Sequence, residues 1–218
     1  MDTSNLVTQA FHRGAEAELL LSKVDSWTAV VKRRIRKEYR HRSLDDLIRR
    51  ERTIVEAFAM HEAKAAGVKV PSIIGIEPET NTILMTHVEG TVARDSLDEM
   101  NPRDATKLFK LLGAQIGLLH AAGIVHGDLT TSNVIVTRSG APFIVDFGMS
   151  KRSAEPEDRG VDLHLLQRSI STSHLKDVSL LVKALARGYR ETAGKTLLDS
   201  SWAKAREIAR RGRYFAIR

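Results

Sequence analysis

Two short motifs place carboxylates and an amide at a fixed spacing. The first is His126-Gly-Asp-Leu-Thr-Thr-Ser-Asn133, and the second is Asp146-Phe-Gly148, which begins 18 positions after Asp128. Phosphoryl transfer from ATP depends on positioning and charge neutralisation more than on covalent help. The Asp128 carboxylate can orient an attacking hydroxyl or water, while oxygens of Asn133 and Asp146 are the hard ligands that Mg²⁺ prefers. We therefore predict that these three residues form the catalytic and magnesium-binding centre of an ATP site.

The specificity of this prediction comes from the combination of the two motifs. His-x-Asp is common in proteins, and Asp-Phe-Gly also occurs in ordinary turns. Their spacing, with a predicted hairpin between them, is what indicates a nucleotide site. His126 is expected to brace the loop rather than to transfer a proton.

A lysine at the end of a predicted strand is the second chemical signal. The strand is Ala29-Val-Val-Lys32, in which Lys32 shares a face with Val30. In kinase-like folds such a lysine contacts the ATP phosphates and is held by a carboxylate from a helix. Glu56 is the preferred partner because it lies in the middle of the predicted long helix, with Glu51 and Glu62 as competitors.

The connection between the first two predicted strands lies where a loop over the phosphates is expected. It reads Arg13-Gly14-Ala-Glu-Ala17 and contains one glycine. Its backbone amides could form a turn over the phosphates, although the lack of Gly-x-Gly limits how closely the chain can approach. An ordinary hairpin turn is the equal alternative from this segment alone.

Hydrophobic patterning and turn residues predict the elements that carry these groups. Residues 6–34 contain three apolar or β-branched runs separated by polar turns, which predict three antiparallel strands. Ser43, followed three residues later by Asp46, reads as a capping box that starts a long helix ending at Gly67. Two more strands are expected at residues 71–76 and 82–88.

The pattern becomes helical after Gly90. Asn101-Pro102 supplies a cap and a first-turn proline for a helix that is expected to end at Gly123. A short hairpin is predicted over residues 134–145, with its turn at Ser139-Gly140. About three further helices are expected from Val161 onward.

Length and composition fit one α+β unit. With 218 residues, 42% of them hydrophobic, the chain can bury a sizeable core. We expect two small lobes that share an interface: residues 1–88, an antiparallel sheet with one long helix, and residues 89–218, mostly helical. The lack of cysteine excludes disulfides and thiolate metal sites and fits the cytoplasm. Neither a signal peptide nor a membrane span is expected, because residues 111–125, the longest uncharged stretch, are fewer than the ~20 that a span needs.

The charge balance points toward a polyanion or toward a generally basic proteome. The formal net charge is +7 and the sequence pI is about 9.8. Basic residues concentrate between Lys32 and Arg52 and again in the tail from Arg206 to Arg218. The first cluster is as readily a solvated helix face, whereas a basic terminal arm more often contacts nucleic acid.

Taken together, these residues resemble the PRPK-like family, the atypical kinase subunit of the KEOPS complex. The string Gly127-Asp-Leu-Thr-Thr-Ser-Asn133 is the most diagnostic part of the resemblance. The family also uses Gly-Ala-Glu-Ala where this chain has Gly14 to Ala17, which accounts for the glycine-poor loop. Other matching segments extend over nearly the whole chain: Val31-Lys-Arg33, Tyr39-Arg-His41, Glu56-Ala57, Gly67-Val68, Glu89-Gly90, Asp146-Phe-Gly148, Glu157 to Leu163 and Arg211-Gly-Arg213.

The resemblance implies a small bilobal protein-kinase-like fold with ATP between the lobes and Mg²⁺ at Asn133 and Asp146. It implies that Asp128 is the catalytic aspartate and that Asp162 supports the catalytic loop. Lys32 and Glu56 would pair, Met85 would line the back of the pocket, and the backbone of residues 86–88 would meet adenine. The nucleotide-binding residues that it implies are Gly14, Val30, Lys32, Glu56, Met85, Thr86 and Val88.

The resemblance also implies partners. These are a threonylcarbamoyl-transferase subunit, a small KEOPS subunit on the N-terminal lobe, and tRNA, whose threonylcarbamoyladenosine (t6A) modification the family supports through its ATPase activity. A tRNA contact from the tail would use Arg210, Arg211 and Arg213. After Arg213 this chain departs from the basic ending that is usual in the family and reads Tyr-Phe-Ala-Ile-Arg218.

The segment after Asp-Phe-Gly is too short for a broad peptide-docking platform. Fifteen residues lie between Asp146 and Asp162, and they contain no Ala-Pro-Glu. Transfer to water, to the protein itself or to one docked partner is therefore expected of an atypical serine/threonine kinase. Two alternatives stay open: a small-molecule kinase of the aminoglycoside or choline type, and a non-catalytic pseudokinase-like adaptor that binds RNA and proteins.

Overall fold

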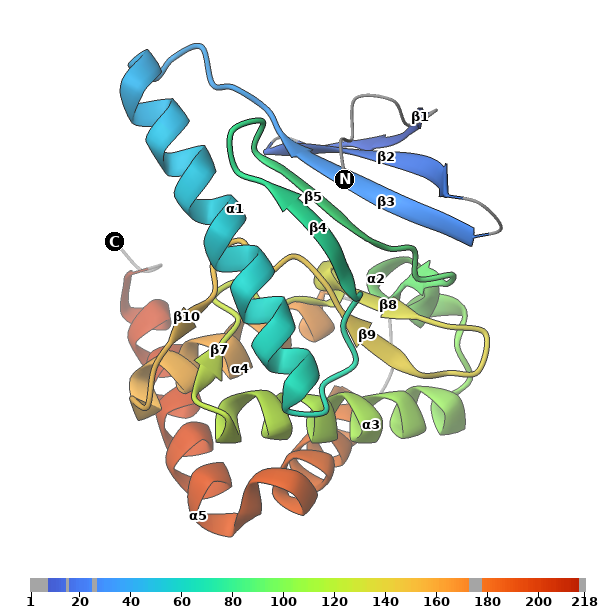
Figure 1. The fold of residues 1–218 in the computed structure, drawn as a ribbon. Coiled ribbons are helices and arrows are strands. Elements are labelled where there is room, and N and C mark those ends of the chain that lie inside the picture. The colour runs from blue at the N-terminus through green and yellow to red at the C-terminus, as the bar shows by residue number, and fades with distance from the viewer. Residues whose placement is uncertain (1–7, 15, 25–26, 173–177, 216–218) are drawn as a thin grey trace.

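The computed structural model describes residues 8–14, 16–24, 27–172 and 178–215 (Figure 1). It has the predicted α+β architecture, in which an antiparallel sheet with one long helix precedes a mostly helical part. In the view of Figure 1 the sheet and helix α1 lie above, and the remaining long helices lie below them.

Five antiparallel strands form the N-terminal sheet in the order β1-β2-β3-β5-β4. They fall close to the predicted positions: β1 (Thr8–Arg13), β2 (Ala17–Val24), β3 (Trp27–Arg34), β4 (Ile73–Glu77) and β5 (Thr82–Thr86). The central strand β3 pairs Val30 with Met85 of β5. Because side chains alternate along a strand, Val30, Lys32 and Arg34 share one face, and the two cations on it reach helix α1.

Helix α1 (Arg42–Ala65) begins two residues earlier than a cap at Ser43 would place it, and the predicted capping box is wrong. The N-cap is His41, whose carbonyl already accepts the Asp45 N–H at 2.9 Å, so Ser43 lies inside the first turn. The N-cap makes no side-chain cap bond. At the other end Gly67, with φ of +88°, supplies the expected C-terminal turn.

A set of short elements leads from the sheet to the helical part: β6 (Thr91–Val92), α2 (Ala93–Ser96) and the 3-10 turn η2 (Leu97–Glu99). Helix α3 (Pro102–Ala121) then starts as predicted. The Asn101 side chain accepts the Asp104 N–H at 2.9 Å, and Pro102 occupies the first turn. Gly123, with φ of +72°, follows the end of the helix.

The two sequence motifs lie in a run of short strands and one turn: β7 (Ile124–Val125), η3 (Thr131–Asn133), β8 (Val134–Val136), β9 (Pro142–Ile144) and β10 (Lys151–Arg152). Strands β8 and β9 form the predicted hairpin, whose turn contains Gly140 at φ of +78°. Strand β6 extends this hairpin, and β10 returns to pair with β7. The hairpin and the return strand bring the two motifs together.

Two helices complete the chain: α4 (Pro156–Ser171) and α5 (Val178–Phe215). Helix α5 consists of two helical segments that meet at Gly194, which has φ of 81° and ψ of 171°, so this region agrees with the three helices expected. Helices α3 and α5 pack closely. A Cβ at Gly113 of α3 would lie 2.0 Å from the Leu185 carbonyl oxygen, so this crossing requires a glycine.

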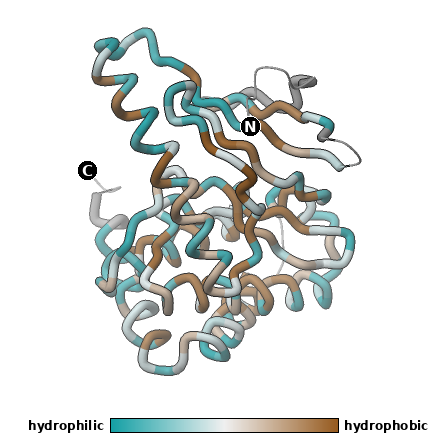
Figure 2. Tube along the Cα trace, viewed as in Figure 1, coloured by the Kyte–Doolittle hydropathy of each residue, from teal (hydrophilic) through white to brown (hydrophobic). Residues whose placement is uncertain are grey.

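One hydrophobic cluster runs from the sheet into the helical part. It joins Val30 and Met85 of the sheet to Leu119 of α3 and to Leu129 and Phe147 of the motif segment. Hydrophobic positions gather in Figure 2 along the strands and where the sheet meets the helices. The two motifs are therefore held between two packed halves of the molecule.

Candidate active site

Strand β3, helix α1 and the Asp-Phe-Gly segment meet at the ammonium group of Lys32. The Lys32 Nζ lies 2.6 Å from Glu56 Oε1 and 2.9 Å from Asp146 Oδ1. Lys32 and Glu56 are buried, whereas 52% of the Asp146 side chain is exposed. The two competitors for Lys32 lie elsewhere, because Glu51 is exposed and Glu62 pairs with an arginine of β10.

The opposite charges of Lys32 and its carboxylate partners each favour the ionised form of the other. Burial alone would lower the pKa of Lys32, but the carboxylates of Glu56 and Asp146 outweigh it and raise that pKa above its ordinary value. Burial alone would raise the pKa of Asp146, and the Lys32 ammonium outweighs it and lowers that pKa. Lys32 therefore stays protonated and Asp146 stays ionised through the neutral range.

Asp128 is held by the residue five positions after it. The Asn133 side-chain amide donates to the Asp128 backbone carbonyl at 2.7 Å and to Asp128 Oδ2 at 3.1 Å. This orientation, assigned from the hydrogen bonds, leaves the Asn133 amide oxygen available as a metal ligand. The turn before Asp128 depends on Gly127, which has φ of +82° and whose Cβ, if present, would lie 2.2 Å from the Met149 carbonyl oxygen.

Asp162 of α4 fixes the backbone on the other side of this loop. Its carboxylate accepts the His126 N–H at 2.6 Å and the Gly127 N–H at 2.8 Å, and it is fully buried. His126 Nε2–H donates to the Val145 carbonyl at 3.0 Å, and its Nδ1 accepts the Asp128 N–H at 3.3 Å. The ring of His126 thus ties the Asp128 loop to the residue before Asp146.

A second histidine extends this network into the helical core. His120 Nε2–H donates to Asp162 Oδ2 at 3.2 Å, so Nδ1 accepts from the Tyr189 hydroxyl at 3.1 Å. The Tyr189 hydroxyl also forms a hydrogen bond with Ser201 Oγ at 3.3 Å. Burial raises the pKa of Tyr189 to about 12, so the hydroxyl remains a donor. Three helices thereby support the carboxylate that holds the loop.

The residues predicted to contact adenine lie at the end of the sheet. Val30 and Met85 are buried neighbours on β3 and β5. Thr86 N–H donates to the Ser72 carbonyl at 2.9 Å, and His87 N–H donates to the Thr28 carbonyl at 3.3 Å. The backbone donors of residues 86 and 87 are thus engaged within the sheet.

The oxygen groups present suit a magnesium ion that is bound together with phosphates. Asp146 supplies a half-exposed carboxylate and Asn133 an amide oxygen. Mg²⁺ usually takes one or two protein oxygens and completes its shell with phosphate and water. Within the described part of the chain no three His, Cys, Asp or Glu residues gather as a metal cluster. A metal–nucleotide complex therefore fits these residues better than a metal held by protein alone.

Comparison with known proteins agrees with this geometry. Residues 21–172 match the RIO domain, a protein-kinase-like fold. The chain belongs to the RIO-domain family. The predicted relationship to the atypical kinases and the bilobal fold are thereby confirmed.

Relatives of this RIO-domain chain are named as a KEOPS complex subunit and as tRNA threonylcarbamoyladenosine biosynthesis proteins. It is 38% identical over 208 residues to the KEOPS complex subunit Bud32 of Pyrococcus abyssi, a match that covers 93% of this chain and 94% of the relative. It is 37% identical to a probable bifunctional tRNA threonylcarbamoyladenosine biosynthesis protein of Methanothermobacter thermautotrophicus and 39% identical to one of Methanospirillum hungatei. Each of these two matches covers 93% of this chain and 36% of the relative, so the chain spans about a third of the bifunctional proteins.

The RIO-domain site includes three buried residues that the sequence analysis did not identify: Arg34, His120 and Tyr189. Arg34 binds Glu56 Oε2 at 2.5 Å from the same strand face as Lys32. The two-residue spacing from Lys32 was the available signal for Arg34. His120 and Tyr189 are 69 positions apart, and the sequence holds no local signal that they meet.

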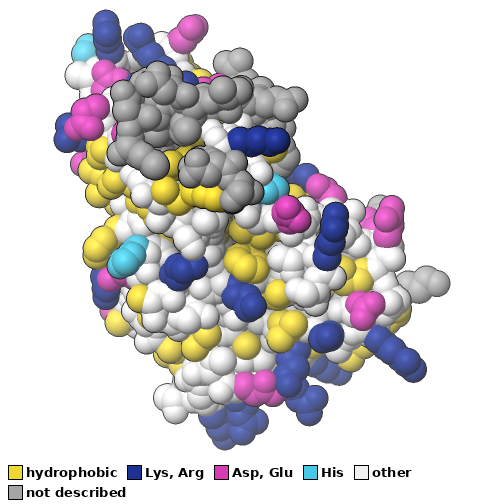
Figure 3. All heavy atoms as spheres, turned by 45° about the vertical axis from the view of Figure 1, so that its right-hand side comes forward, with side chains coloured by type: hydrophobic (Ala, Val, Ile, Leu, Met, Phe, Trp, Pro, Cys, Tyr) yellow, Lys and Arg dark blue, Asp and Glu magenta, His cyan; other side chains and the backbone are white. Residues whose placement is uncertain are grey.

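Of the three arginines predicted to contact nucleic acid from the tail, one has carboxylate partners in the described part of the chain. Arg211 pairs with both Glu157 and Glu207, and Arg210 is exposed. The side chain of Arg213 lies outside the described residues. Other lysines and arginines gather over the helical part at the lower end of the face shown in Figure 3. Among the described helices, none is long and apolar enough to cross a membrane.

Proposed function

We propose that this chain is a Mg-ATP-dependent phosphotransferase and ATPase, an atypical serine/threonine kinase that serves a KEOPS complex in t6A modification of tRNA. The observation that carries the proposal is the contact of Lys32 with both Glu56 and Asp146, beside a loop in which Asn133 holds Asp128. The names of the relatives support the link to tRNA modification.

Each residue has a proposed role that follows from its contacts. Lys32, positioned by Glu56, contacts the phosphates of ATP, and Gly14 lies in the turn that covers them. Asn133 and Asp146 supply the oxygens for magnesium, which when bound neutralises the charge of the transferred phosphoryl group. Asp128 orients the attacking hydroxyl or water. His126 and Asp162 hold the loop that carries Asp128.

The adenine would lie between Val30 and Met85 on one side and the chain after β5 on the other. The N–H groups of Thr86 and His87 bond within the sheet, so the donor to adenine is assigned to Val88. The carbonyl of Thr86 would accept from the exocyclic amine. The segment that links the two proposed lobes, residues 1–88 and 89–218, would therefore lie beside the adenine.

The phosphoryl acceptor is proposed to be water or one docked protein. Between Asp146 and Asp162 the chain forms only the short strand β10 and the start of α4. No wide platform for a peptide is formed by so short a segment. The proposed partners are a threonylcarbamoyl-transferase subunit, a small subunit on the N-terminal lobe, and tRNA, and the proposed location is the cytoplasm.

The test is a measurement of ADP release with and without magnesium, the transferase subunit and tRNA. Wild type is expected to hydrolyse ATP only with magnesium and faster with the partner. Asp128→Ala is expected to lose roughly 100-fold or more in kcat, because the attacking group is no longer oriented. Hydrolysis at the wild-type rate in Asp128→Ala would refute the catalytic assignment.

A matched control is Asp199→Ala, which removes an exposed aspartate of α5 far along the chain from the motifs. This variant should hydrolyse ATP like wild type. The two open alternatives give other results. Turnover that requires an added aminoglycoside or choline would indicate a small-molecule kinase, and tRNA binding without turnover in wild type would indicate an adaptor.

A further inference from the structure

Arg34 is a buried cation whose position the proposed chemistry does not yet explain. It lies two residues after Lys32 on β3, on the same face, and only 6% of it is exposed. Removing a guanidinium from water is costly unless partners replace the solvent. The partners of Arg34 therefore indicate what it does.

Those partners come from three separate segments. The Nη2 of Arg34 lies 2.5 Å from Glu56 Oε2 and donates to the Arg52 carbonyl at 3.4 Å, both on α1. Its Nη1 lies 3.9 Å from Glu16 Oε2, in the connection between β1 and β2. A Cβ at Gly148 of the Asp-Phe-Gly motif would lie 2.5 Å from Nη2, so the guanidinium fills the space beside that glycine.

The two oxygens of Glu56 are shared between two cations. Oε1 binds Lys32 and Oε2 binds Arg34, and all three side chains are buried. A carboxylate with one partner could rotate and carry its lysine with it. A carboxylate bonded at both oxygens is fixed in orientation, so the position of the Lys32 ammonium is fixed as well.

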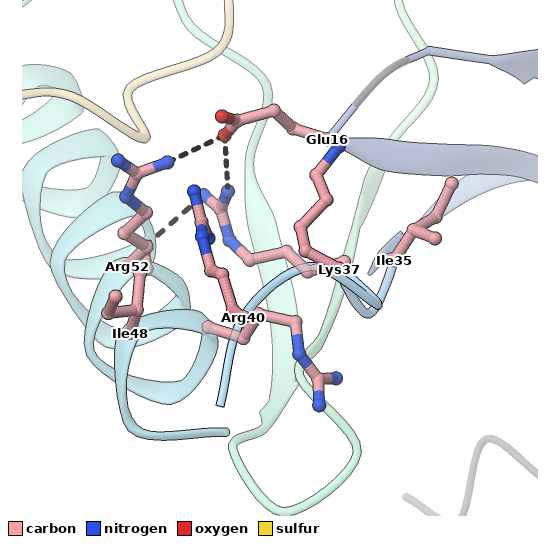
Figure 4. A pocket seen from close by; sticks show the side chains of 8 residues that line it. Glu16, Ile35, Lys37, Arg40, Ile48 and Arg52 are labelled. Atoms are coloured by element: carbon pink, nitrogen blue, oxygen red, sulfur yellow. Dashed lines mark hydrogen bonds and ion pairs between the residues drawn. The ribbon is translucent and has the colours of Figure 1, made fainter. Parts of the chain in front are cut away.

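Glu16 extends the arrangement to the connection between β1 and β2. Its Oε2 lies 2.7 Å from Arg52 Nη1 of α1 (Figure 4), in addition to its longer contact with Arg34. This connection has a single glycine at position 14 and therefore lacks the close backbone approach of a Gly-x-Gly loop. A side-chain tie to α1 supplies an alternative way to hold it.

We propose that Arg34 is a positioning residue for the phosphoryl-transfer site, which orients Glu56, and through it Lys32, and helps Glu16 join the β1–β2 connection to α1. The proposal rests on the proposed function. It makes the geometry at the phosphates depend on a group that does not itself touch the nucleotide.

The experiment compares Arg34→Met with Arg33→Met. Arg33 is the adjacent residue on the opposite face of β3, with 45% of its side chain exposed and Glu18 at 3.6 Å, so its removal takes the same charge from the same strand. Arg34→Met is expected to lower kcat for ATP hydrolysis roughly 100-fold per folded molecule, because the phosphate-contacting ammonium is misplaced. The KM for ATP should change far less, since adenine contacts remain. Arg33→Met should leave both constants unchanged.

Arg34→Lys provides the conservative variant. Its ammonium can bind Glu56, but it lacks the planar fork that also reaches the Arg52 carbonyl and Glu16. It should recover a large part of the lost kcat, and Glu16→Gln should show a smaller loss than Arg34→Met. If Arg34→Met does not fold, Arg34→Lys and Glu16→Gln test the proposal in its place. A wild-type kcat in Arg34→Met would overturn the proposal. A wild-type kcat in both Arg34→Lys and Glu16→Gln would overturn it as well.

Hydrogen exchange of the nucleotide-free protein separates this proposal from the proposed function. Amides of residues 52–60 and 16–18 should exchange faster in Arg34→Met than in Arg33→Met. Equal exchange in the two variants would show that Arg34 does not hold α1 and would overturn the proposal. An absence of ATP turnover in wild type would refute the proposed function, while the exchange comparison would still decide whether Arg34 fixes Glu56.

Discussion

At the scale of single residues, the site depends on groups that are each held by more than one partner. Asp162 accepts two backbone N–H groups, Glu56 binds two cations, and Lys32 binds two carboxylates. Asp146 adopts φ of +64°, which residues other than glycine rarely do, so its surroundings must favour that conformation. Such residues are sensitive to changes that alter either a charge or a backbone angle.

Gly127→Ala is expected to prevent the loop of Asp128 from forming. The added Cβ would lie 2.2 Å from the Met149 carbonyl oxygen, and the residue would also have to adopt φ of +82°. ATP hydrolysis should be lost and the free energy of unfolding strongly reduced. The matched control is Gly140→Ala, which has φ of +78° but open space around the Cβ. It should cost only about 1–2 kcal/mol, measured by urea unfolding, and equal losses in both variants would contradict the role of the Met149 contact.

Asp146→Asn should change the acid dependence of stability. The folded pKa of Asp146 lies below its ordinary value of 3.8, so its ionic stabilisation is present above that value and is lost as pH falls through the folded pKa. The difference in unfolding free energy between wild type and Asp146→Asn should therefore be largest near neutral pH and shrink below about pH 4. Urea unfolding from pH 3 to pH 7 measures it. A difference that is constant over this range would argue against the Lys32–Asp146 pair.

At the scale of elements, the start of α1 shows where a sequence pattern fails. A hydroxyl followed three residues later by an acid predicted a capping box at Ser43, but the helix begins at Arg42. The buried Asp45 pairs with Arg49 one turn later in the same helix and with Arg40 just before the helix, and it lies in the first turn. The start of α3 was predicted correctly because Asn101 and the following proline act locally. The cap at Asn101 was predictable because its partner lies three residues later, whereas the pattern at Ser43 took no account of the charges beside Asp45.

Gly194→Ala tests the break within α5. With φ of 81° and ψ of 171°, this position lies in a region that is almost restricted to glycine, and no atom lies within 4 Å of the Cβ position. The substitution should therefore cost about 1–3 kcal/mol through backbone strain alone. Gly75→Ala in β4 is the control, because it has the same open space and no positive φ. Equal urea midpoints for the two variants would show that α5 can continue through residue 194 without cost.

At the scale of the whole molecule, the sequence predicted the α+β fold and the convergence of two motifs. Lys32, Asp128, Asn133 and Asp146 were predicted from their types and spacing, and their chemical roles stay predictions. Glu56 was favoured over two neighbours by its position in the helix, and it is the glutamate that lies beside Lys32. The remaining members of the network required the tertiary structure, since His120 and Tyr189 lie on helices far apart in sequence, which approach closely at Gly113 and Gly117.

The contact between Lys32 and Asp146 has a thermodynamic consequence for the affinities of nucleotide and cation. Asp146 Oδ1 is a poor ligand for a divalent cation while it binds the Lys32 ammonium group at 2.9 Å. Phosphates that draw Lys32 away would free this oxygen, so nucleotide and cation should bind with positive cooperativity. Linkage requires the effect to be reciprocal: each ligand raises the affinity for the other by the same factor. The protein alone should therefore be a weak cation binder that becomes a strong one only in the presence of nucleotide.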